Sequence, residues 1–239
     1  MKILIVLPAY NEAKILEQNV LKLVQFVRAN FFGQEYKIAI SDNNSLDQTA
    51  VIAKSLMEKY PELDYIFVPE QGKGYAISRP WLLNQDKFDI FIFLDADLAT
   101  DLSALPKLIA GISAGYDVVI GSRYLKESEV KKSLGRWIFS FGYRLILKLA
   151  LGTKIKDLPC GFKAVNQKII KNIVPQIKNY TWFFDSEMVY LAEKAGYKIK
   201  EIPVKWAEPR TADDKSRVNV FKVSFLYLKE IIKLKFRKI

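Results

Sequence analysis

The chain of 239 residues is long enough for one sizeable domain, and a hydrophobic content of 50% excludes global disorder. An excess of 37 Lys+Arg over 26 Asp+Glu gives a formal charge of +11, which indicates an anionic partner or a solubilising surface. The absence of His and the single Cys160 exclude His-based catalysis, an intramolecular disulfide and His- or thiolate-cluster zinc sites. We expect neither a signal peptide nor a membrane span, because no uncharged apolar run approaches roughly 18–20 residues.

The first half alternates short apolar runs with amphipathic segments. Runs rich in Ile, Val and Phe predict buried strands at residues 3–7, 37–40, 65–68, 90–94 and 118–120. Helical spacing places Ile15, Leu16, Val20, Leu23, Val24 and Val27 on one face. A second helix is predicted over 102–111. This alternation predicts an α/β fold with a mostly parallel sheet flanked by helices.

The second half has a different pattern. Residues 125–133 are charged and turn-like, an aromatic-rich amphipathic stretch follows from 137 to 147, and we predict a helix over 184–195 and a strand over 198–204. Residues 219–239 interleave large apolar side chains with six cations, Lys222, Lys229, Lys233, Lys235, Arg237 and Lys238. We therefore predict one catalytic domain over 1–206, with a nucleotide-binding half (1–124) and an acceptor half (125–206), and a basic amphipathic tail over 207–239.

Polar clusters follow three of the predicted strands. They comprise residues 8–12 after the first strand, Asp42 and Asn43 after the second, and Asp95 and Asp97 after the fourth. Ligands of open parallel sheets bind beyond the carboxyl ends of the strands. The three clusters are therefore candidates for one site.

Asp95 and Asp97 give the most specific signal. In an extended segment, side chains at i and i+2 point the same way, so both carboxylates would face one small volume. Two like charges that close favour a hard divalent cation, Mg²⁺ or Mn²⁺, which would neutralise a substrate diphosphate. The alternative is a solvated turn with an N-cap Asp.

The remaining polar positions each have two interpretations. Asp42 is suited to a base N–H or a ribose hydroxyl, or to an Asx-turn before the next helix. Glu12 is suited to ribose contact or to helix capping. Residues 72–74 offer a flexible loop whose Lys73 is a cation for phosphate, although the P-loop spacing is missing.

Together these pieces resemble the family-2 glycosyltransferases of the GT-A fold over roughly residues 1–206. The matching pieces, in order, are LPAYNE, SDNNSLDQT, GKGYAI, DADLAT, GSRY, CGFKAV, WFFDSEM and EIPVKW. The branch looks like the polyprenyl-phosphate sugar synthases, which include dolichyl-phosphate glucosyl- and mannosyltransferases. SDNNS departs from the commoner DDGS, and Ala99 stands where mannosyl relatives often carry a Gln. The wording of DADLAT, CGFKAV, FDSEM and PVKW looks more like the glucosyl branch.

The resemblance implies a role for each matching position. Nucleotide binding is implied for Pro8, Ala9, Tyr10, Glu12 and Asp42, and we place Asn43, Lys73, Asp95 and Ala96 with them. Asp95 and Asp97 match the metal and diphosphate motif and are expected, with Arg123, to be catalytic. Acceptor or phosphate binding is implied for Arg123, Arg136 and Ser140, and on a looser match for Arg210, Ser216 and Arg217. A snorkelling surface cation is the alternative for Arg136.

The implied reaction is inverting transfer of a hexose, glucose favoured over mannose, from UDP-glucose or GDP-mannose to a polyprenyl phosphate. A phosphate monoester is already anionic near neutral pH, so it needs no strong general base, which agrees with a chain that lacks His. If the acceptor were instead a saccharide hydroxyl, a carboxylate base would be required. Asp185 or Glu187 would be candidates, although helix capping and an ion pair with Lys are the alternative.

Charge placement decides between the possible anionic partners. The basic tail and the region around Trp137 favour reversible attachment to an anionic membrane surface, on its inner, cytoplasmic face. The alternative is a helix packed on the domain with a solvated basic face. A nucleic-acid-binding module is disfavoured, because no helix-turn-helix, zinc or RNP pattern is present and the acidic DAD cluster would repel phosphate without metal.

Overall fold

The computed structural model describes residues 1–31, 33–131, 134–207 and 220–237. Within helices α5 (Leu134–Leu151) and α8 (Val220–Lys235), side chains are described from 142 onward, except 143, and from 227 onward. The predicted sites Arg210, Ser216 and Arg217 lie outside the described residues, as do the side chains of Arg136 and Ser140.

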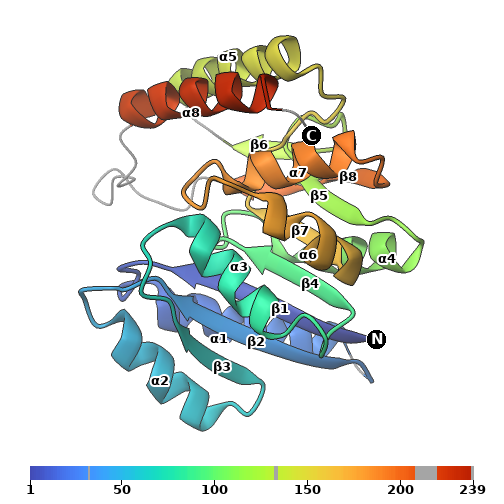
Figure 1. Ribbon diagram of the computed structural model, residues 1–239. Helices are drawn as coiled ribbons and strands as arrows, with labels where there is room; N and C mark the ends of the chain where they lie inside the picture. Colours follow the sequence, from blue (N-terminus) through green and yellow to red (C-terminus); the bar gives the residue numbers. More distant parts are fainter. Residues whose placement is uncertain (32, 132–133, 208–219, 238–239) are drawn as a thin grey trace.

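A seven-stranded sheet in the order β3-β2-β1-β4-β7-β5-β8 forms the centre of the molecule (Figure 1). Its strands are β1 (Lys2–Ala9), β2 (Glu35–Asp42), β3 (Leu63–Phe67), β4 (Ile90–Leu94), β5 (Val118–Ser122), β7 (Phe162–Asn166) and β8 (Ile199–Pro203). All neighbours are parallel except β7, which is antiparallel to both β4 and β5. The predicted mostly parallel sheet is confirmed, and β7 is an addition to the predicted strands.

Helices cover both faces of the sheet, with α3 and α6 on one side and α1 on the other (Figure 1). The helices are α1 (Leu16–Asn30), α2 (Thr49–Lys59), α3 (Lys73–Leu83), α4 (Leu105–Ser113), α6 (Gln167–Asn172) and α7 (Phe184–Lys194). Short 3₁₀ turns span Leu102–Ala104 and Val174–Gln176. Five of the six apolar positions predicted for the first helix are buried in α1, and Ile15 precedes it half-buried.

The core explains why the strands read as continuous apolar runs. Every residue of β4 is buried, because helices cover both of its faces. Trp81 of α3 packs against Phe91 and Phe93 of β4 and against Phe184 of α7, with ring centroids 5.8–6.5 Å apart. This aromatic cluster fixes α3 and α7 beside the end of β4, where the polar clusters lie.

The second half contains features that the sequence did not predict. The segment expected to be turn-like, 125–133, includes β6 (Glu129–Lys131), which pairs in parallel with β9 (Lys205–Ala207). Within the predicted tail, residues 220–235 form α8, which packs against α5 and buries Ile231 and Leu234 (Figure 1). The described part of the tail is therefore a helix that packs on α5, and the predicted division at residue 206 stays a prediction.

None of the described helices combines the length and the low charge that crossing a bilayer requires.

Candidate active site

The polar clusters meet at one edge of the sheet. Strand pairing places Ala9 of β1 beside Asp42 of β2, and Leu94 of β4 beside Phe162 of β7. Because β7 is antiparallel to β4, the residue before β7 and the residue after β4 lie at the same edge. The predicted convergence of Asp42 and Asp95 at the carboxyl ends of β2 and β4 is confirmed.

The loop after β1 is tied to the loop after β2. The Asn11 side chain accepts the Leu46 N–H at 2.7 Å, and the Glu12 N–H donates to Thr49 Oγ1 at 2.8 Å. Asn11 adopts φ 55°, a left-handed conformation that Asn tolerates. Pro8 and Ala9 end β1, and the following Tyr10 is exposed. These loops form a single wall, and nucleotide binding there stays a prediction.

Asp42 and Asn43 mainly organise this wall. The buried Asp42 accepts the Ser45 N–H, three residues further along the chain, at 3.0 Å and the Tyr65 hydroxyl at 2.9 Å. Burial, together with Asp42, raises the pKa of Tyr65 to about 12. Asn43 donates to the Glu70 carbonyl at 2.6 Å and accepts the Gly72 N–H at 2.7 Å. Asn43 therefore shapes the segment that leads to Lys73.

The glycines of the GKG triplet serve close packing. A Cβ on Gly72 would lie 2.4 Å from the Tyr180 carbonyl oxygen, and one on Gly74 would lie 2.6 Å from Tyr180 Cα. The start of α3 thus presses against the segment before α7. Lys73 and Gly74 thus belong to the first turn of α3 and not to a loop, and the glycines bring Lys73 close to α7. The predicted role of Lys73 as a cation for phosphate stays a prediction.

Lys73 links two acidic residues from different parts of the chain. Its Nζ lies 2.7 Å from Asp95 Oδ1 and 3.1 Å from Asp185 Oδ2, and its side chain is only 13% exposed. Burial lowers the pKa of Lys73, but the two carboxylates outweigh it and hold that pKa above its usual range. Lys73 is therefore a permanent cation beside the DAD turn.

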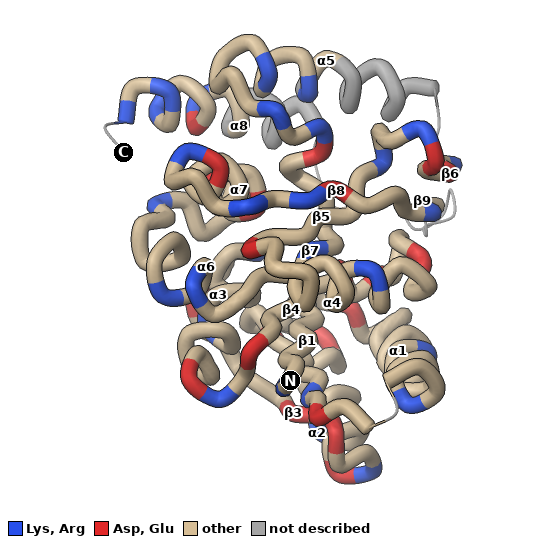
Figure 2. The backbone as a smooth tube through the Cα atoms, turned by 90° about the vertical axis from the view of Figure 1, so that its right-hand side faces the viewer, with Lys and Arg blue, Asp and Glu red and all other residues tan. Residues whose placement is uncertain are grey.

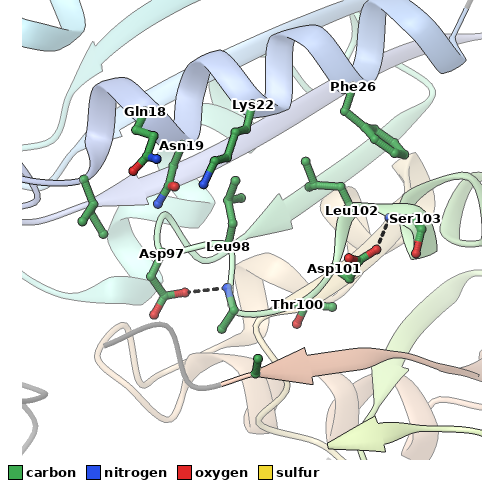
Figure 3. A pocket seen from close by; sticks show the side chains of 13 residues that line it. Gln18, Asn19, Lys22, Phe26, Asp97, Leu98, Thr100, Asp101, Leu102 and Ser103 are labelled. Carbon is green, nitrogen blue, oxygen red and sulfur yellow. Dashed lines mark hydrogen bonds between the residues drawn. The ribbon is translucent and has the colours of Figure 1, made fainter. Parts of the chain in front are cut away.

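The DAD segment is a turn, so the predicted extended alternation is wrong. β4 ends at Leu94, the Leu98 N–H donates to the Asp95 carbonyl at 3.0 Å, and Leu98 has φ 48°. Asp95 pairs with Lys73, whereas Asp97 accepts the Ala99 N–H at 3.1 Å. Asp97 also lines a cleft of ≈ 620 Å³ between α1 and the loop over 97–103 (Figure 3).

Two residues that the sequence reasoning missed hold this turn. Asn19 of α1 donates to the Ala96 carbonyl at 2.9 Å in a buried hydrogen bond. The Gly161 carbonyl accepts the Asp95 N–H at 3.1 Å, and a Cβ on Gly161 would lie 1.9 Å from Asp95 Oδ2. The sequence offered a clue to each residue, because Asn19 is a polar residue on an apolar helix face and Gly161 lies in the CGFKAV piece.

The donor set around Asp95 suits a hard divalent ion. The Asp95 side chain is 42% exposed and offers oxygen ligands, as does Asp97. Across the described part of the chain, no group of three or more His, Cys, Asp or Glu residues gathers as a metal cage. Mg²⁺ usually takes one or two carboxylates and completes its shell with water and substrate phosphates. The chemistry of these two carboxylates therefore suits an ion that a diphosphate helps to hold.

Asp185 opens α7 and is buried between two lysines. Its Oδ2 accepts from Lys73, and its Oδ1 lies 4.0 Å from Nζ of Lys163, whose side chain is fully buried. Lys163 donates to the Cys160 carbonyl, and burial lowers the pKa of Lys163 despite the opposing effect of Asp185. The sequence reasoning missed Lys163, which also stood in the CGFKAV piece.

Glu187 has a structural set of partners. Its two oxygens accept the N–H groups of Lys178 and Asn179 at 3.0 and 2.9 Å, and Oε1 also lies 2.7 Å from Arg237. Tyr227 of α8 adds a hydrogen bond to the Trp182 carbonyl at 2.8 Å. The ion-pair interpretation thus describes Glu187 better than the base interpretation, with Arg237 as the partner in place of a Lys. The two N–H groups lie in the segment before α7, so Glu187 does not cap that helix.

Arg123 is held in a bidentate pair with Asp157. Its Nε and Nη2 donate to the two Asp157 oxygens at 2.8 Å each, and its own N–H donates to the same carboxylate at 2.9 Å. Burial alone would raise the pKa of Asp157, but the charge and hydrogen bonds of Arg123 lower it. Asp157 was missed, and it fixes the position of Arg123 after β5.

Solved structures of a glycosyltransferase share this fold. The crystal structure of glucosyl-3-phosphoglycerate synthase from Mycobacterium tuberculosis with UDP has a TM-score of 0.69 at 17% identity, covering 100% of this chain and 81% of that one. Another structure of that enzyme contains Mn²⁺, UDP and phosphoglyceric acid. The predicted GT-A fold is confirmed.

The sequence relatives carry sugar-transferase names. A dolichyl-phosphate beta-glucosyltransferase of Dictyostelium discoideum is 30% identical over 98% of this chain and 73% of its own length. A dolichol-phosphate mannosyltransferase of Pyrococcus furiosus is 32% identical over 72% of this chain and 48% of its length. The glycosyltransferase AglD of Haloferax volcanii is 29% identical over 86% of this chain, which spans 33% of AglD. The family model described as "Glycosyl transferase family 2" matches residues 4–174, and the chain belongs to this family.

Proposed function

We propose that this chain transfers a hexose, glucose in preference to mannose, from a nucleotide diphosphate sugar to a dolichyl-type polyprenyl phosphate, with inversion at the anomeric carbon. The observation that carries the proposal is the 30% identity to a dolichyl-phosphate beta-glucosyltransferase over 98% of the chain. The placement of Asp95 and Lys73 at the carboxyl end of β4 supports it.

The residues around the DAD turn have distinct tasks in this reaction. The wall formed by the loops after β1 and β2 binds the nucleoside, with Tyr10 exposed for contact. Asp95 and Asp97 would hold Mg²⁺ or Mn²⁺, which supplies positive charge to the departing diphosphate when bound. Lys73 adds a fixed cation at the same place.

The acceptor side favours a phosphate over a hydroxyl. A phosphate monoester has a second pKa of about 6 and attacks without losing a proton to the protein. Asp185, the remaining candidate base, is 3% exposed and already accepts from Lys73. Family-2 transfer to a saccharide hydroxyl is therefore the second candidate, which would require Asp185 to exchange that partner for a substrate hydroxyl.

An apolar surface on α5 and α8 supports attachment to a lipid surface. We name this surface the α5–α8 face; its large exposed apolar side chains are Leu145, Ile146, Leu149, Leu228, Ile232 and Phe236. Leu149 and Phe236 are 75% and 77% exposed. The exposed Lys148, Lys229, Lys233 and Lys235 accompany them, and Figure 2 shows basic positions along α8. Each such cation contributes about 1 kcal/mol at an anionic leaflet.

The membrane step is tested by flotation of the intact protein with anionic vesicles. Leu149→Glu should weaken binding, since it places a charge in the α5–α8 face, while Leu46→Glu, at an equally exposed leucine before α2, should not. Equal loss in both variants would remove the surface assignment. The inner, cytoplasmic side is our expectation, because the free thiol of Cys160 suits a reducing compartment.

The activity is tested with radiolabelled UDP-glucose and GDP-mannose, Mg²⁺ or Mn²⁺, and a polyprenyl phosphate. We expect label in the organic phase, more of it from UDP-glucose, and a product of inverted anomeric configuration by NMR. Omission of the metal should abolish transfer. Label that appears only on added oligosaccharides would favour the second candidate, and the absence of any transfer would refute both.

A further inference from the structure

The ammonium group of Lys73 occupies the place beside Asp95 where a divalent ion would bind. The Lys73 ammonium lies 2.7 Å from Asp95 Oδ1, so one of the two oxygens that Asp95 could offer a divalent ion is already paired with a cation. This pair is not a loose surface contact, because Lys73 is 13% exposed and the glycines on either side press α3 against Tyr180. Two cations on one carboxylate oxygen repel each other strongly in a partly buried site.

We propose that Lys73 is a resident counter-ion of Asp95, which the divalent ion displaces and which then moves to the donor diphosphate. This inference rests on the proposed function, because it assigns Lys73 a role in the same donor site. In the free protein, Lys73 competes with the divalent ion for Asp95. In the protein with metal and donor bound, Lys73 contacts the donor diphosphate. Lys73 thereby couples the two binding events.

Asp185 makes the displacement possible. It lies 3.1 Å from Lys73 Nζ on the buried side, so an ammonium that leaves Asp95 keeps one carboxylate partner. Asp185 is itself held in place by Lys163, 4.0 Å away, at the base of the site. Lys73 therefore swings about a fixed anchor and stays beside the DAD turn, and the cost of exchanging partners is small compared with full release into solvent.

The proposal predicts effects of opposite sign for Lys73→Gln. Without the competing ammonium, Mn²⁺ alone should bind at least about tenfold more tightly, a figure discounted for the exposure of Asp95. Without the cation at the diphosphate, UDP in the presence of Mn²⁺ should bind at least about tenfold more weakly. A general loss of structure would weaken both ligands.

Mn²⁺ binding is measured by electron paramagnetic resonance and UDP binding by calorimetry. Lys22→Gln, on α1 beside the Asp97 cleft, is the matched control, because it removes the same charge without touching Asp95. Lys73→Arg should keep Mn²⁺ affinity near wild type, since it retains the charge. Tighter Mn²⁺ binding in Lys22→Gln as large as in Lys73→Gln, or no gain in Lys73→Gln, would overturn the proposal.

A second measurement uses the protein with Lys73 intact, so that its result does not depend on whether Lys73→Gln folds. Lys73 Nζ lies 6.0 Å from the Trp182 ring, so its displacement should change tryptophan fluorescence on titration with diamagnetic Mg²⁺. Trp182→Phe should abolish that change and leave Mg²⁺ affinity intact. A titration that gives the same signal in Trp182→Phe would count against the movement. These experiments use only the metal ion and UDP, without any acceptor of the sugar. Their outcome is therefore independent of whether the proposed polyprenyl phosphate acceptor is correct.

Discussion

Gly161→Ala tests whether the position of Asp95 matters for the reaction. Gly161 has no positive φ, so alanine is allowed by its backbone, but the added Cβ would lie 1.9 Å from Asp95 Oδ2 and 2.4 Å from its Cγ. The Asp95 side chain is 42% exposed and must give way, which breaks its contact with Lys73. The substitution therefore displaces a charged group without removing it.

We expect Gly161→Ala to lower kcat much more than it lowers the free energy of unfolding. Loss of a group that stabilises transition-state charge costs about 2.7–4 kcal/mol of barrier, or about 10²–10³ in kcat. Unfolding free energy should fall by no more than about 1–3 kcal/mol, the range of overpacking, because the carboxylate can move toward solvent. Transfer to the lipid acceptor and Mn²⁺ binding are measured together with urea denaturation.

A second glycine, Gly142, provides the control for Gly161→Ala. Gly142→Ala adds the same methyl group where no described atom, apart from its chain neighbours and the backbone of its own helix, lies within 4 Å. In the interior of α5 it should stabilise the protein by about 0.5–1 kcal/mol without changing kcat. Near wild-type turnover and Mn²⁺ affinity in Gly161→Ala would show that the placement of Asp95 is not required. That result would remove the DAD turn from the mechanism.

Three further predictions concern neighbouring residues. Asp97→Asn should lose at least about 10²–10³ in kcat with an unchanged denaturation midpoint, and near wild-type turnover would contradict the metal assignment. Asn19→Ala should lower unfolding free energy by about 1–3 kcal/mol in urea, because it leaves the buried Ala96 carbonyl unpaired, and no loss would contradict the clamp. The folded-state pKa of Asp157 is lowered by Arg123, so this pair should stabilise the protein above the unfolded pKa of 3.8 and lose that stabilisation as pH falls through the lower folded value. The difference in unfolding free energy between wild type and Asp157→Asn should therefore shrink with acidification below pH 3.8, and a constant difference would argue against the pair.

The sheet was predictable because burial on both faces leaves a strong sequence signal. β1 and β4 are nearly continuous apolar runs and β2 holds a short one at 38–40, and parallel pairing then brings Asp42 and Asp95 to one edge. β7 was missed because Lys163 is the second of its residues and its register depends on distant strands. A fully buried lysine breaks the pattern that identifies strands, and its presence is explained by the Cys160 carbonyl and the nearby Asp185.

The details of the site depend on contacts that spacing alone does not reveal. The i, i+2 argument for Asp95 and Asp97 assumed that β4 continues, but the left-handed Leu98 closes a turn directly after it. Likewise, the resemblance identified Arg123 without its partner Asp157, which lies 34 residues further along the chain. Residue types were therefore predictable from motifs, whereas pairing required the tertiary structure.

The α5–α8 face and the donor site share one short segment of chain. Trp182, whose ring lies near Lys73, accepts the Tyr227 hydroxyl of α8 through its carbonyl, and Glu187 binds Arg237 just after that helix. A helix that carries exposed apolar side chains outward is thus fastened inward to the residues that flank Asp185 at the start of α7. Since polyprenyl phosphates present their charged group at the lipid surface, this connection places the helix that we propose as a membrane anchor within a few contacts of the cations that the proposed reaction uses.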